Sequence, residues 1–352
     1  MVGAQSSHPG RLTELDALRG VGALCVMLFH YTTRFHQLFP QAPHVAVHFP
    51  EGDYWVLLFF TISGFSIFFT LDRIGGVADF AVNRFARLYP AYLVAMAITL
   101  AVEYGAQSVQ AKTLLVGPMA ILANLTMLQG FVFLPSVDGV YWTLSVEIAF
   151  YLCMIAIWRT VGGRRIELVM LGWLALRSLY GVWPDMPERI IMVTVLRYIP
   201  FFMIGVLAYR VWSGQRSIGQ QSPYALLALL SVATMESLDV LLWGGLMIAL
   251  FTALIHDRLG FLRRGPLPWL GGISYSFYLV HQHVGFVVLI EMGEAGYAPW
   301  IGFVTAVSVA LVLGTAINRL VERPVGNAIT RWWKRRRAHR NALAGRYAGQ
   351  AG

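Results

Sequence analysis

The chain has 352 residues, of which 57% are hydrophobic and only 13% are charged, about half the charged share of a soluble domain. A soluble protein this apolar lacks the polar side chains to cover its surface, so the composition predicts an all-α, polytopic membrane helix bundle. At roughly 20 residues per crossing, the length leaves room for about ten helices and for no separate soluble domain. The two cysteines, Cys25 and Cys153, lie in apolar runs, which argues against a disulfide framework and a cysteine metal cluster.

The formal net charge of +9 suggests nucleic-acid binding at first, but the basic residues follow a membrane pattern. They gather in loops between apolar runs and in the carboxy-terminal tail, at Arg331, Lys334, Arg335, Arg336, Arg337 and Arg340. Cytoplasmic segments of membrane proteins carry such an excess of arginine and lysine. We therefore expect anionic membrane lipids as the partner of these residues, and no nucleic acid.

Apolar runs predict eleven candidate membrane segments. They cover residues 15–35, 54–71, 89–104, 113–133, 140–158, 166–183, 189–212, 223–238, 240–257, 269–291 and 298–320. If all eleven crossed the membrane, the basic clusters at 159–165 and 263–264 and the basic tail would lie outside the cell. If residues 113–133 enter and return on one side, every basic cluster lies in the cytoplasm. We therefore expect ten crossings and a re-entrant segment, with both termini in the cytoplasm.

The segment 113–133 carries its own signs of a re-entrant path, because Gly117, Pro118 and Asn124 interrupt it. The first 15 residues are polar and contain no signal-peptide core, so residues 15–35 are predicted to be an uncleaved first crossing. The chain then divides into three parts: a cytoplasmic amino terminus at 1–14, a membrane domain at 15–324 and a basic cytoplasmic tail at 325–352.

Charged groups at membrane depth are costly unless they are paired, so those of the first span need a reason. His30 follows Arg19 by eleven residues, close to three helical turns, which places both on nearly the same face. His30 lies roughly 16 Å further along the helix. Asp16 is expected to pair with Arg19, and Gly20 permits close approach of another helix or a ligand. His30 is a candidate general base, and a hydrogen bond between packed helices is the alternative.

The string NRFARLYPAY places Arg84 and Arg87 one helical turn apart at the end of a loop, just before Pro90. We expect Pro90 to begin the third span, since the first turn of a helix tolerates its missing N–H. Two guanidinium groups at this spacing can grip phosphate oxygens. A role in membrane topology alone is the alternative.

The fifth predicted span contains Glu147 in VYWTLSVEIAFYL, with Tyr151 one turn further along. In the ten-crossing topology Glu147 lies at about the depth of His30, so we expect the carboxylate to orient the imidazole or share a proton with it. A structural hydrogen bond to a tyrosine or tryptophan is the alternative. Arg177 and Arg197 are candidate counter-ions for Glu147.

In the tenth span, ISYSFYLVHQ, the residues Ser274, Tyr278 and His281 follow i, i+4, i+7 spacing and share one face, which must point into the bundle. Together with Asp16 and Ser145 they are expected to support the site. No metal site is predicted, because neither a helix nor a further ligand accompanies the histidines of the first outer loop, His36, His44 and His48.

Six strings of the sequence resemble, in order along the chain, the acyltransferase-3 family of integral membrane O-acyltransferases. They are LDALRGVGALCVMLFH, FFTISGFSIF, NRFARLYPAY, VYWTLSVEIAFY, ISYSFYLVHQ and VERP, and the match extends from about Arg11 to Pro324. The resemblance implies transfer of an acyl group, most often acetyl, from cytoplasmic acyl-CoA to a hydroxyl in the plasma (bacterial inner) membrane. It implies acyl-CoA as donor substrate with no bound cofactor. The implied acceptor is a carbohydrate or glycoconjugate, with exopolysaccharide expected first.

The resemblance also implies roles for individual residues. An arginine and a histidine of the first span matter for activity in the family, and here they are Arg19 and His30. The family's paired arginines match Arg84 and Arg87, and its span-five glutamate matches Glu147. The hypothesis that follows has the arginines hold the CoA phosphates while His30 deprotonates the acceptor hydroxyl. An acyl-histidine intermediate ranks second.

Three further expectations complete this interpretation. Either Glu147 or His281 orients the reacting groups. No added carboxy-terminal extracytoplasmic domain follows the bundle, so acceptor choice is expected to lie in the bundle and its short outer loops. Two other functions stay open, a transporter or flippase of a lipid-linked sugar and a non-catalytic membrane subunit. The lack of inverted repeats argues against the first, and the presence of His30 with the arginine pair argues against the second.

Overall fold

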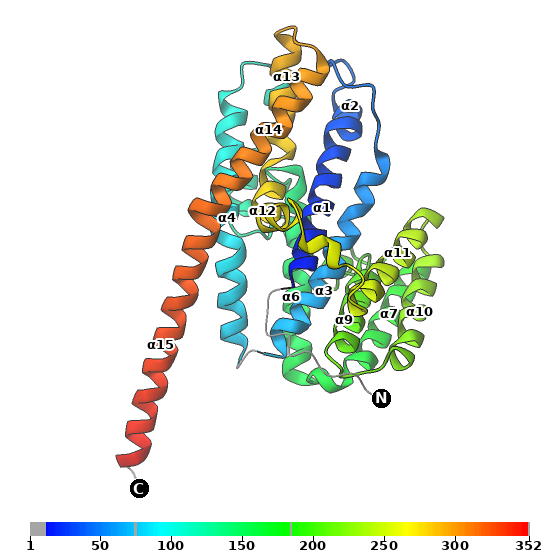
Figure 1. The fold of residues 1–352 in the computed structure, drawn as a ribbon, viewed down its shortest axis with the longest axis vertical. Helices are drawn as coiled ribbons and strands as arrows, with labels where there is room; N and C mark the ends of the chain where they lie inside the picture. The colour runs from blue at the N-terminus through cyan, green and yellow to red at the C-terminus, as the bar shows by residue number, and fades with distance from the viewer. Residues whose placement is uncertain (1–11, 74–75, 184, 351–352) are drawn as a thin grey trace.

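A computed structural model describes residues 12–73, 76–183 and 185–350, and these form helices and turns with no strand (Figure 1). The predicted all-α class is therefore confirmed. Arg11 and most of the predicted amino terminus lie outside the described residues, as do the last two residues of the tail.

Fifteen α-helices follow one another among the described residues. They are α1 Thr13–Phe29, α2 Phe35–Leu38, α3 Val56–Leu71, α4 Val77–Gly105, α5 Pro118–Asn124, α6 Trp142–Thr160, α7 Ile166–Val182, α8 Glu188–Val193, α9 Ile199–Trp212, α10 Ile218–Ala233, α11 Leu238–Ile255, α12 Leu267–Val280, α13 Gln282–Glu294, α14 Pro299–Ile317 and α15 Arg323–Gln350. Two π-helical turns, η1 His30–Arg34 and η8 Asn318–Glu322, continue α1 and α14. The 3₁₀ turns are η2 Pro50–Trp55, η3 Ala111–Leu114, η4 Gln129–Val132, η5 Gly139–Tyr141, η6 Gly163–Arg165 and η7 Gly260–Arg263.

Five helical stretches of the described residues are long and apolar enough to cross a membrane, and a bent helix pair adds a sixth. They are Pro50–Leu71, Val77–Gly105, Gly139–Thr160, Leu238–Ile255, Pro299–Arg340 and the pair α12 and α13. The chain is thus a multi-pass membrane protein. The first predicted span is continuous through α1, η1 and α2 but carries several charged residues. The other remaining spans form shorter or broken helices, such as α9 with 14 residues, so the count of ten crossings stays a prediction.

Three boundaries differ from the sequence prediction. The helix α4 begins at Val77, so Arg84 and Arg87 lie on a helix and not at the end of a loop. Pro90 lies inside α4 and does not begin it. A helix can contain a proline at the cost of one backbone hydrogen bond. Residues 189–212 are broken between α8 and α9.

The segment 113–133 forms no continuous helix, which agrees with its prediction as a non-crossing segment. It contains η3, the seven-residue α5 and η4, joined by turns. Asn124 holds the turns together, because its amide donates to the carbonyl of Pro135 at 2.9 Å and its Oδ1 accepts from the backbone of Val137 at 3.0 Å. An irregular backbone at membrane depth needs such internal partners.

The first and tenth predicted spans meet through two glycines. The helix α1 packs along α12, and a Cβ atom on Gly20 would lie 2.6 Å from the backbone nitrogen of Gly271. No Cβ fits that space, so glycine permits the two helices to touch backbone to backbone. The helices α1 and α12 therefore lie side by side near the centre of the molecule (Figure 1).

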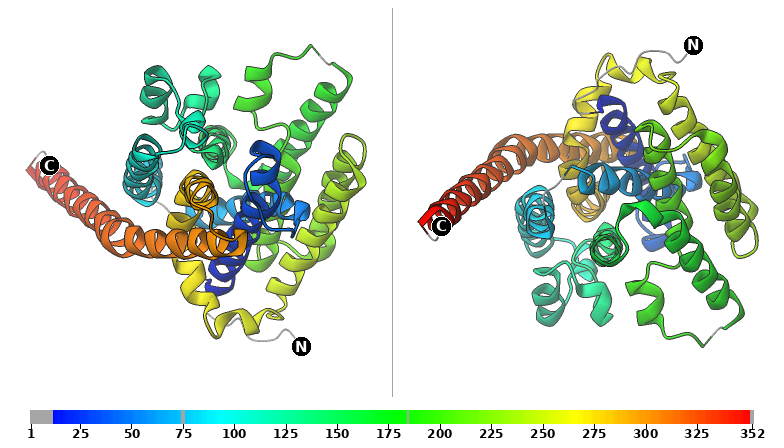
Figure 2. Two further views of the ribbon diagram at one scale, coloured as in Figure 1. Left: turned by 90° about the horizontal axis from the view of Figure 1, so that it is seen from above. Right: turned by 90° about the horizontal axis from the view of Figure 1, so that it is seen from below.

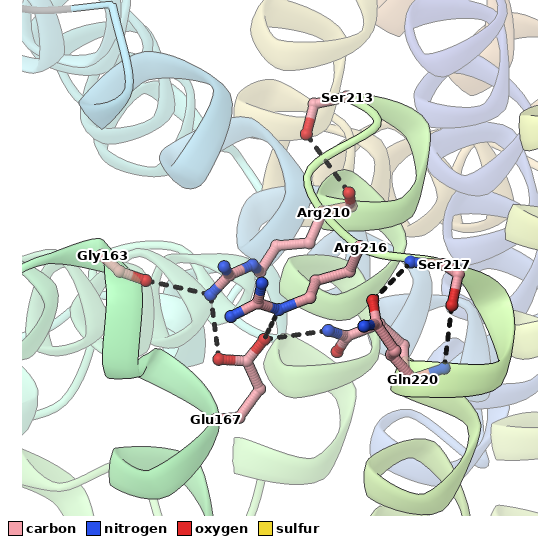
Figure 3. A network of polar contacts seen from close by, with 8 residues as sticks. Gly163, Glu167, Arg210, Ser213, Arg216, Ser217 and Gln220 are labelled. Atoms are coloured by element: carbon pink, nitrogen blue, oxygen red, sulfur yellow. Dashed lines mark hydrogen bonds and ion pairs between the residues drawn. The ribbon is translucent and has the colours of Figure 1, made fainter.

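A buried ion cluster joins α7, α9 and α10 beside the main bundle (Figure 3). The Glu167 carboxylate accepts from Arg210 at 2.9 Å, from Arg216 at 3.3 Å and from Gln221 at 2.8 Å. Arg210 donates further to the carbonyl of Gly163. We call this set the Glu167 cluster, and it fixes the linker between α9 and α10 against the start of α7.

The basic tail forms a helix that continues α14 and extends away from the rest of the bundle (Figure 2). Asp79 on α4 holds its middle, since it accepts from the Trp333 indole at 2.7 Å and forms an ion pair with Arg337. The helix α15 therefore leaves the bundle in a direction that α4 fixes.

Candidate active site

Polar residues of α1, α3, α4 and α12 surround a cavity beside the first turns of α1. Arg19 forms the predicted ion pair with Asp16, at 3.0 Å, and donates a second hydrogen bond to Ser66 at 2.7 Å. The Asp16–Arg19 prediction is thus confirmed. Because Ser66 is neutral, the second bond fixes the guanidinium without reducing its charge.

Arg84 is buried and is held by hydroxyl groups. It donates to Thr70 on α3 and, at 3.5 Å, to the phenol oxygen of Tyr151 on α6. The same phenol donates to Glu147, which also accepts from Ser63 at 2.9 Å. Glu147 therefore acts on Arg84 through Tyr151 and leaves the positive charge of that arginine unpaired.

Arg87 makes no hydrogen bond or ion pair with the described residues, and its side chain is exposed to the cavity. The cavity has a volume of about 390 Å³. Its polar lining consists of Asp16, Arg19, Ser66, Thr70, Arg84, Arg87, Ser274, Tyr275 and Glu322. We call it the arginine cavity. Three guanidinium groups face two carboxylates in it, so the lining is net positive and suits an anionic ligand.

A second, narrower cavity of about 80 Å³ adjoins the arginine cavity, since the two share Arg19, Arg87, Ser274 and Tyr275 as lining residues. Its walls are mostly apolar, with Phe59, Phe60, Leu88 and Leu144 among them. Glu147 and Tyr278 supply polar groups. The narrow cavity reaches Tyr278, whose ring centroid lies 5.5 Å from that of His281.

His30 and His281 form a hydrogen-bonded pair beyond the narrow cavity. The Nδ1 of His281 lies 2.8 Å from the carbonyl oxygen of Tyr278, which only accepts, so this nitrogen carries the proton. The Nε2 of neutral His281 is then an acceptor, and it lies 2.9 Å from Nδ1 of His30. His30 therefore donates through Nδ1, and among the described residues no hydrogen bond engages the lone pair on its Nε2. That is the tautomer a general base requires.

The two imidazoles of the pair differ in exposure. His281 is fully buried, while His30 is only partly buried. Tyr31 donates to the carbonyl oxygen of His281 at 2.5 Å, which holds the backbone at the junction of α12 and α13. The predicted polar face of Ser274, Tyr278 and His281 is thus confirmed as an inward face.

The structure corrects the predicted partner of Glu147. Among the described residues no contact joins Glu147 to His30, and His281 occupies the position beside that imidazole. The carboxylate of Glu147 does not reach His30, because Glu147 lines the narrow cavity together with Arg19 and Arg87. The predicted counter-ions were also wrong.

Arg177 and Arg197 pair elsewhere, with Glu236 at 2.8 Å and with Glu188 at 3.1 Å. Ser145 also lines neither the arginine cavity nor the narrow cavity. It donates to the carbonyl of Met127 at 2.9 Å and so anchors the irregular segment to α6.

Sequence reasoning missed a buried cluster next to the histidine pair. His283 donates from Nδ1 to Glu103 at 2.7 Å, and its Nε2 accepts from the backbone of Gly139 at 3.2 Å. Its own backbone N–H donates to Asp138 at 3.0 Å. These contacts stabilise the 67° bend between α12 and α13. Glu103 was detectable, as an isolated acid in the third apolar span.

The family model described as an acyltransferase domain, acyltransferase-3, matches residues 12–319. The chain is 26% identical to "Acyltransferase MdmB" of Streptomyces mycarofaciens, over 89% of this chain and 91% of that protein. It is 24% identical to "Nodulation protein 10" of Rhizobium leguminosarum bv. viciae, over 92% and 96%.

It is also 28% identical to "Exopolysaccharide production protein ExoZ" of Rhizobium meliloti (strain 1021), over 82% of this chain and 94% of that protein. No solved structure shows a significant match to the chain. The family model extends from α1 into η8 and covers the histidine pair and, apart from Glu322, every residue that lines the two cavities. The chain therefore belongs to the acyltransferase-3 family and is a membrane O-acyltransferase.

Proposed function

We propose that the protein transfers an acetyl group from cytoplasmic acetyl-CoA to a hydroxyl of a carbohydrate acceptor in the plasma membrane. The single observation that carries the proposal is the His30–His281 pair, which leaves Nε2 of His30 free as a base. The exopolysaccharide named for the relative ExoZ supports a carbohydrate as acceptor.

The arginine cavity is the proposed binding site of the donor. Coenzyme A carries several phosphate charges, and arginine matches phosphate oxygens in charge and in geometry. Arg87 has free donors for them, while Arg19 and Arg84 are already oriented by hydroxyl groups. We propose that this end of the bundle, with both termini, faces the cytoplasm, where acyl-CoA is made.

The narrow cavity is the proposed path of the pantetheine arm and thioester. Its apolar walls fit a thin, largely uncharged chain, and it leads toward Tyr278 and the histidine pair. Glu147 is proposed to position Tyr151 and Arg84 along this path.

The proposed reaction is a direct acyl transfer. The acceptor oxygen attacks the thioester carbonyl carbon while its proton moves to Nε2 of His30. The carbon–sulfur bond then breaks, an ester forms, and the coenzyme A thiolate takes the proton from the imidazolium. His281 is proposed as a positioning residue that keeps His30 in the productive tautomer, the role that a carboxylate has in hydrolase triads.

The test is acetyl transfer from acetyl-CoA by the purified full-length protein, with His30→Ala compared to the wild type. We expect kcat to fall by about 10²–10⁴-fold, because general-base catalysis contributes that much. A His30→Ala protein with near-normal turnover would remove His30 from the chemistry. Protein-bound radiolabel from acetyl-CoA without acceptor would favour an acyl-histidine intermediate over direct transfer.

His281 is tested by a pair of substitutions. His281→Gln keeps a hydrogen-bond acceptor for Nδ1 of His30, whereas His281→Leu removes it. We expect kcat to fall on the order of 10- to 100-fold more in the leucine variant, as for loss of a buried hydrogen bond. The KM for acetyl-CoA should stay the same in both. Equal kcat values in the two variants would exclude the positioning role.

A further inference from the structure

A cavity of about 470 Å³ is lined in part by Phe29, the residue directly before His30. It forms where the end of α1, the turn η2 and the start of α11 meet, and its volume is in the range of small-molecule sites. Its main polar and aromatic lining residues are Arg34, Glu51, Asp53, Tyr54, Asp239 and Trp243. We call it the outer cavity, since it lies near the end of α1 opposite the arginine cavity.

Aromatic rings form one wall of the outer cavity. The ring centroids of Tyr54 and Trp243 lie 5.9 Å apart, with planes inclined by 31°. Trp55 packs edge-on against Trp243 at 5.3 Å, which fixes the indole in place. Both Tyr54 and Trp243 remain partly exposed. The negative face of such a ring attracts the C–H groups on the apolar face of a pyranose.

Three carboxylates form another part of the lining. Glu51, Asp53 and Asp239 are exposed, and within the described part of the chain none of them accepts a hydrogen bond or forms an ion pair. Ionised carboxylates only accept, and each can receive several hydroxyl groups. Arg34 donates once to Gln37, at 3.2 Å, and retains further N–H groups. Sugar hydroxyls both donate and accept, so they match this mixture.

The charge of the outer cavity excludes the donor substrate. Three carboxylates and one guanidinium leave it net negative, whereas the arginine cavity is net positive. The outer cavity therefore repels the phosphates of coenzyme A, and the arginine cavity attracts them. A metal ion is not the better occupant, because the described residues contain no group of three or more side chains arranged to hold one.

The outer cavity adjoins the reactive imidazole through a single side chain. Phe29 lines the cavity, and its ring centroid lies 5.2 Å from that of His30. Arg34 belongs to the π-helical turn that begins at His30. A molecule bound in the cavity thus rests on the same turn of backbone that carries the proposed base.

We propose that the outer cavity binds a neutral or amino hexopyranose unit of the acceptor, stacked on Trp243 with its hydroxyls on Asp53 and Asp239. This inference rests on the proposed function only in identifying the bound sugar as part of the acceptor. Binding of the sugar itself is measurable without turnover. An acidic sugar is disfavoured, because its carboxylate meets three others.

The test is saturation-transfer NMR on the full-length protein in lipid nanodiscs, with methyl glucopyranoside, lactose and glucuronate as probes. We expect signals from the two neutral sugars and a weaker one from glucuronate. Trp243→Ala should abolish the signals, and Trp243→Phe should restore them. Trp300→Ala, which changes an exposed tryptophan outside the cavity, should leave them unchanged. Absence of signal from every probe with the wild type would overturn the inference.

A kinetic arm separates this inference from the proposed function. With a neutral acceptor, Trp243→Ala and Asp239→Asn should raise the acceptor KM by about tenfold or more and leave the acetyl-CoA KM unchanged. If the wild type acetylates sugars and neither variant changes the acceptor KM, the outer cavity is not the acceptor site. If the wild type binds sugars at Trp243 but transfers no acetyl group, the proposed function fails and the sugar site stands.

Discussion

Two clusters of arginines in this molecule differ in how their charge is balanced. In the Glu167 cluster, Arg210 and Arg216 both donate directly to one carboxylate, so each guanidinium has a charged acceptor within the protein. In the arginine cavity, Arg84 is held by hydroxyl groups instead. Arg84 donates to Thr70 and a tyrosine, and no carboxylate of the described residues forms an ion pair with it.

A hydroxyl acceptor fixes the direction of a guanidinium without cancelling its charge. Arg19 combines both modes, with an ion pair to Asp16 and a hydrogen bond to Ser66. Arg87, with no hydrogen bond to the described residues, completes the set. The two clusters therefore differ in how far their arginines are paired with carboxylates. They do not differ in burial, since Arg84 and Arg210 are both buried.

The largest expected effect is on stability, in the Glu167 cluster. Glu167→Ala leaves the buried Arg210 without its counter-ion, which should lower the free energy of unfolding by about 3–5 kcal/mol. Thermal unfolding of the purified protein measures this. Glu188→Ala is the matched control, because its pair with Arg197 is exposed and should contribute about 0–1 kcal/mol. If Glu167→Ala left the stability normal but raised the acetyl-CoA KM, the Glu167 cluster would act in donor binding like the arginine cavity, which would contradict the comparison.

The next effect is on donor binding, in the arginine cavity. Arg87→Ala should raise the KM for acetyl-CoA by about 10- to 100-fold, because a charge-assisted hydrogen bond to phosphate is lost. The unfolding temperature should not change, since Arg87 has no hydrogen-bond partner in the described protein to lose. Arg336→Ala serves as control, because the exposed Arg336 stacks on Trp332 and neither residue lines the arginine cavity. Equal KM increases in both variants would indicate a general effect of charge.

The smallest effect concerns Glu147. Glu147→Gln keeps an oxygen that accepts from Ser63 and Tyr151, so kcat/KM should fall by only about fivefold, the difference between a charged and a neutral acceptor. The assay is acetyl transfer at varied acetyl-CoA. A loss of more than about 100-fold, beyond what a weakened hydrogen bond explains, would instead assign Glu147 a direct part in catalysis.

Local patterns predicted much of this molecule correctly. The apolar composition indicated a membrane helix bundle, and the helices α3, α6 and α11 lie close to their predicted ranges. The i, i+4, i+7 spacing of Ser274, Tyr278 and His281 correctly predicted an inward polar face. These properties depend on residues within a few turns of one helix, so they can be predicted from the sequence of that helix alone.

The sequence by itself determined which groups enter the membrane domain and which of them share a helix face. Only the tertiary structure decided their partners, because His30 and His281 are 251 residues apart and meet through the contact of α1 with α12. The 67° bend after α12 and the depth of Glu147 depend on the same packing. Helical periodicity sets the rotation of residues about one axis, whereas the relative position of two axes follows from all the helices packed between and around them.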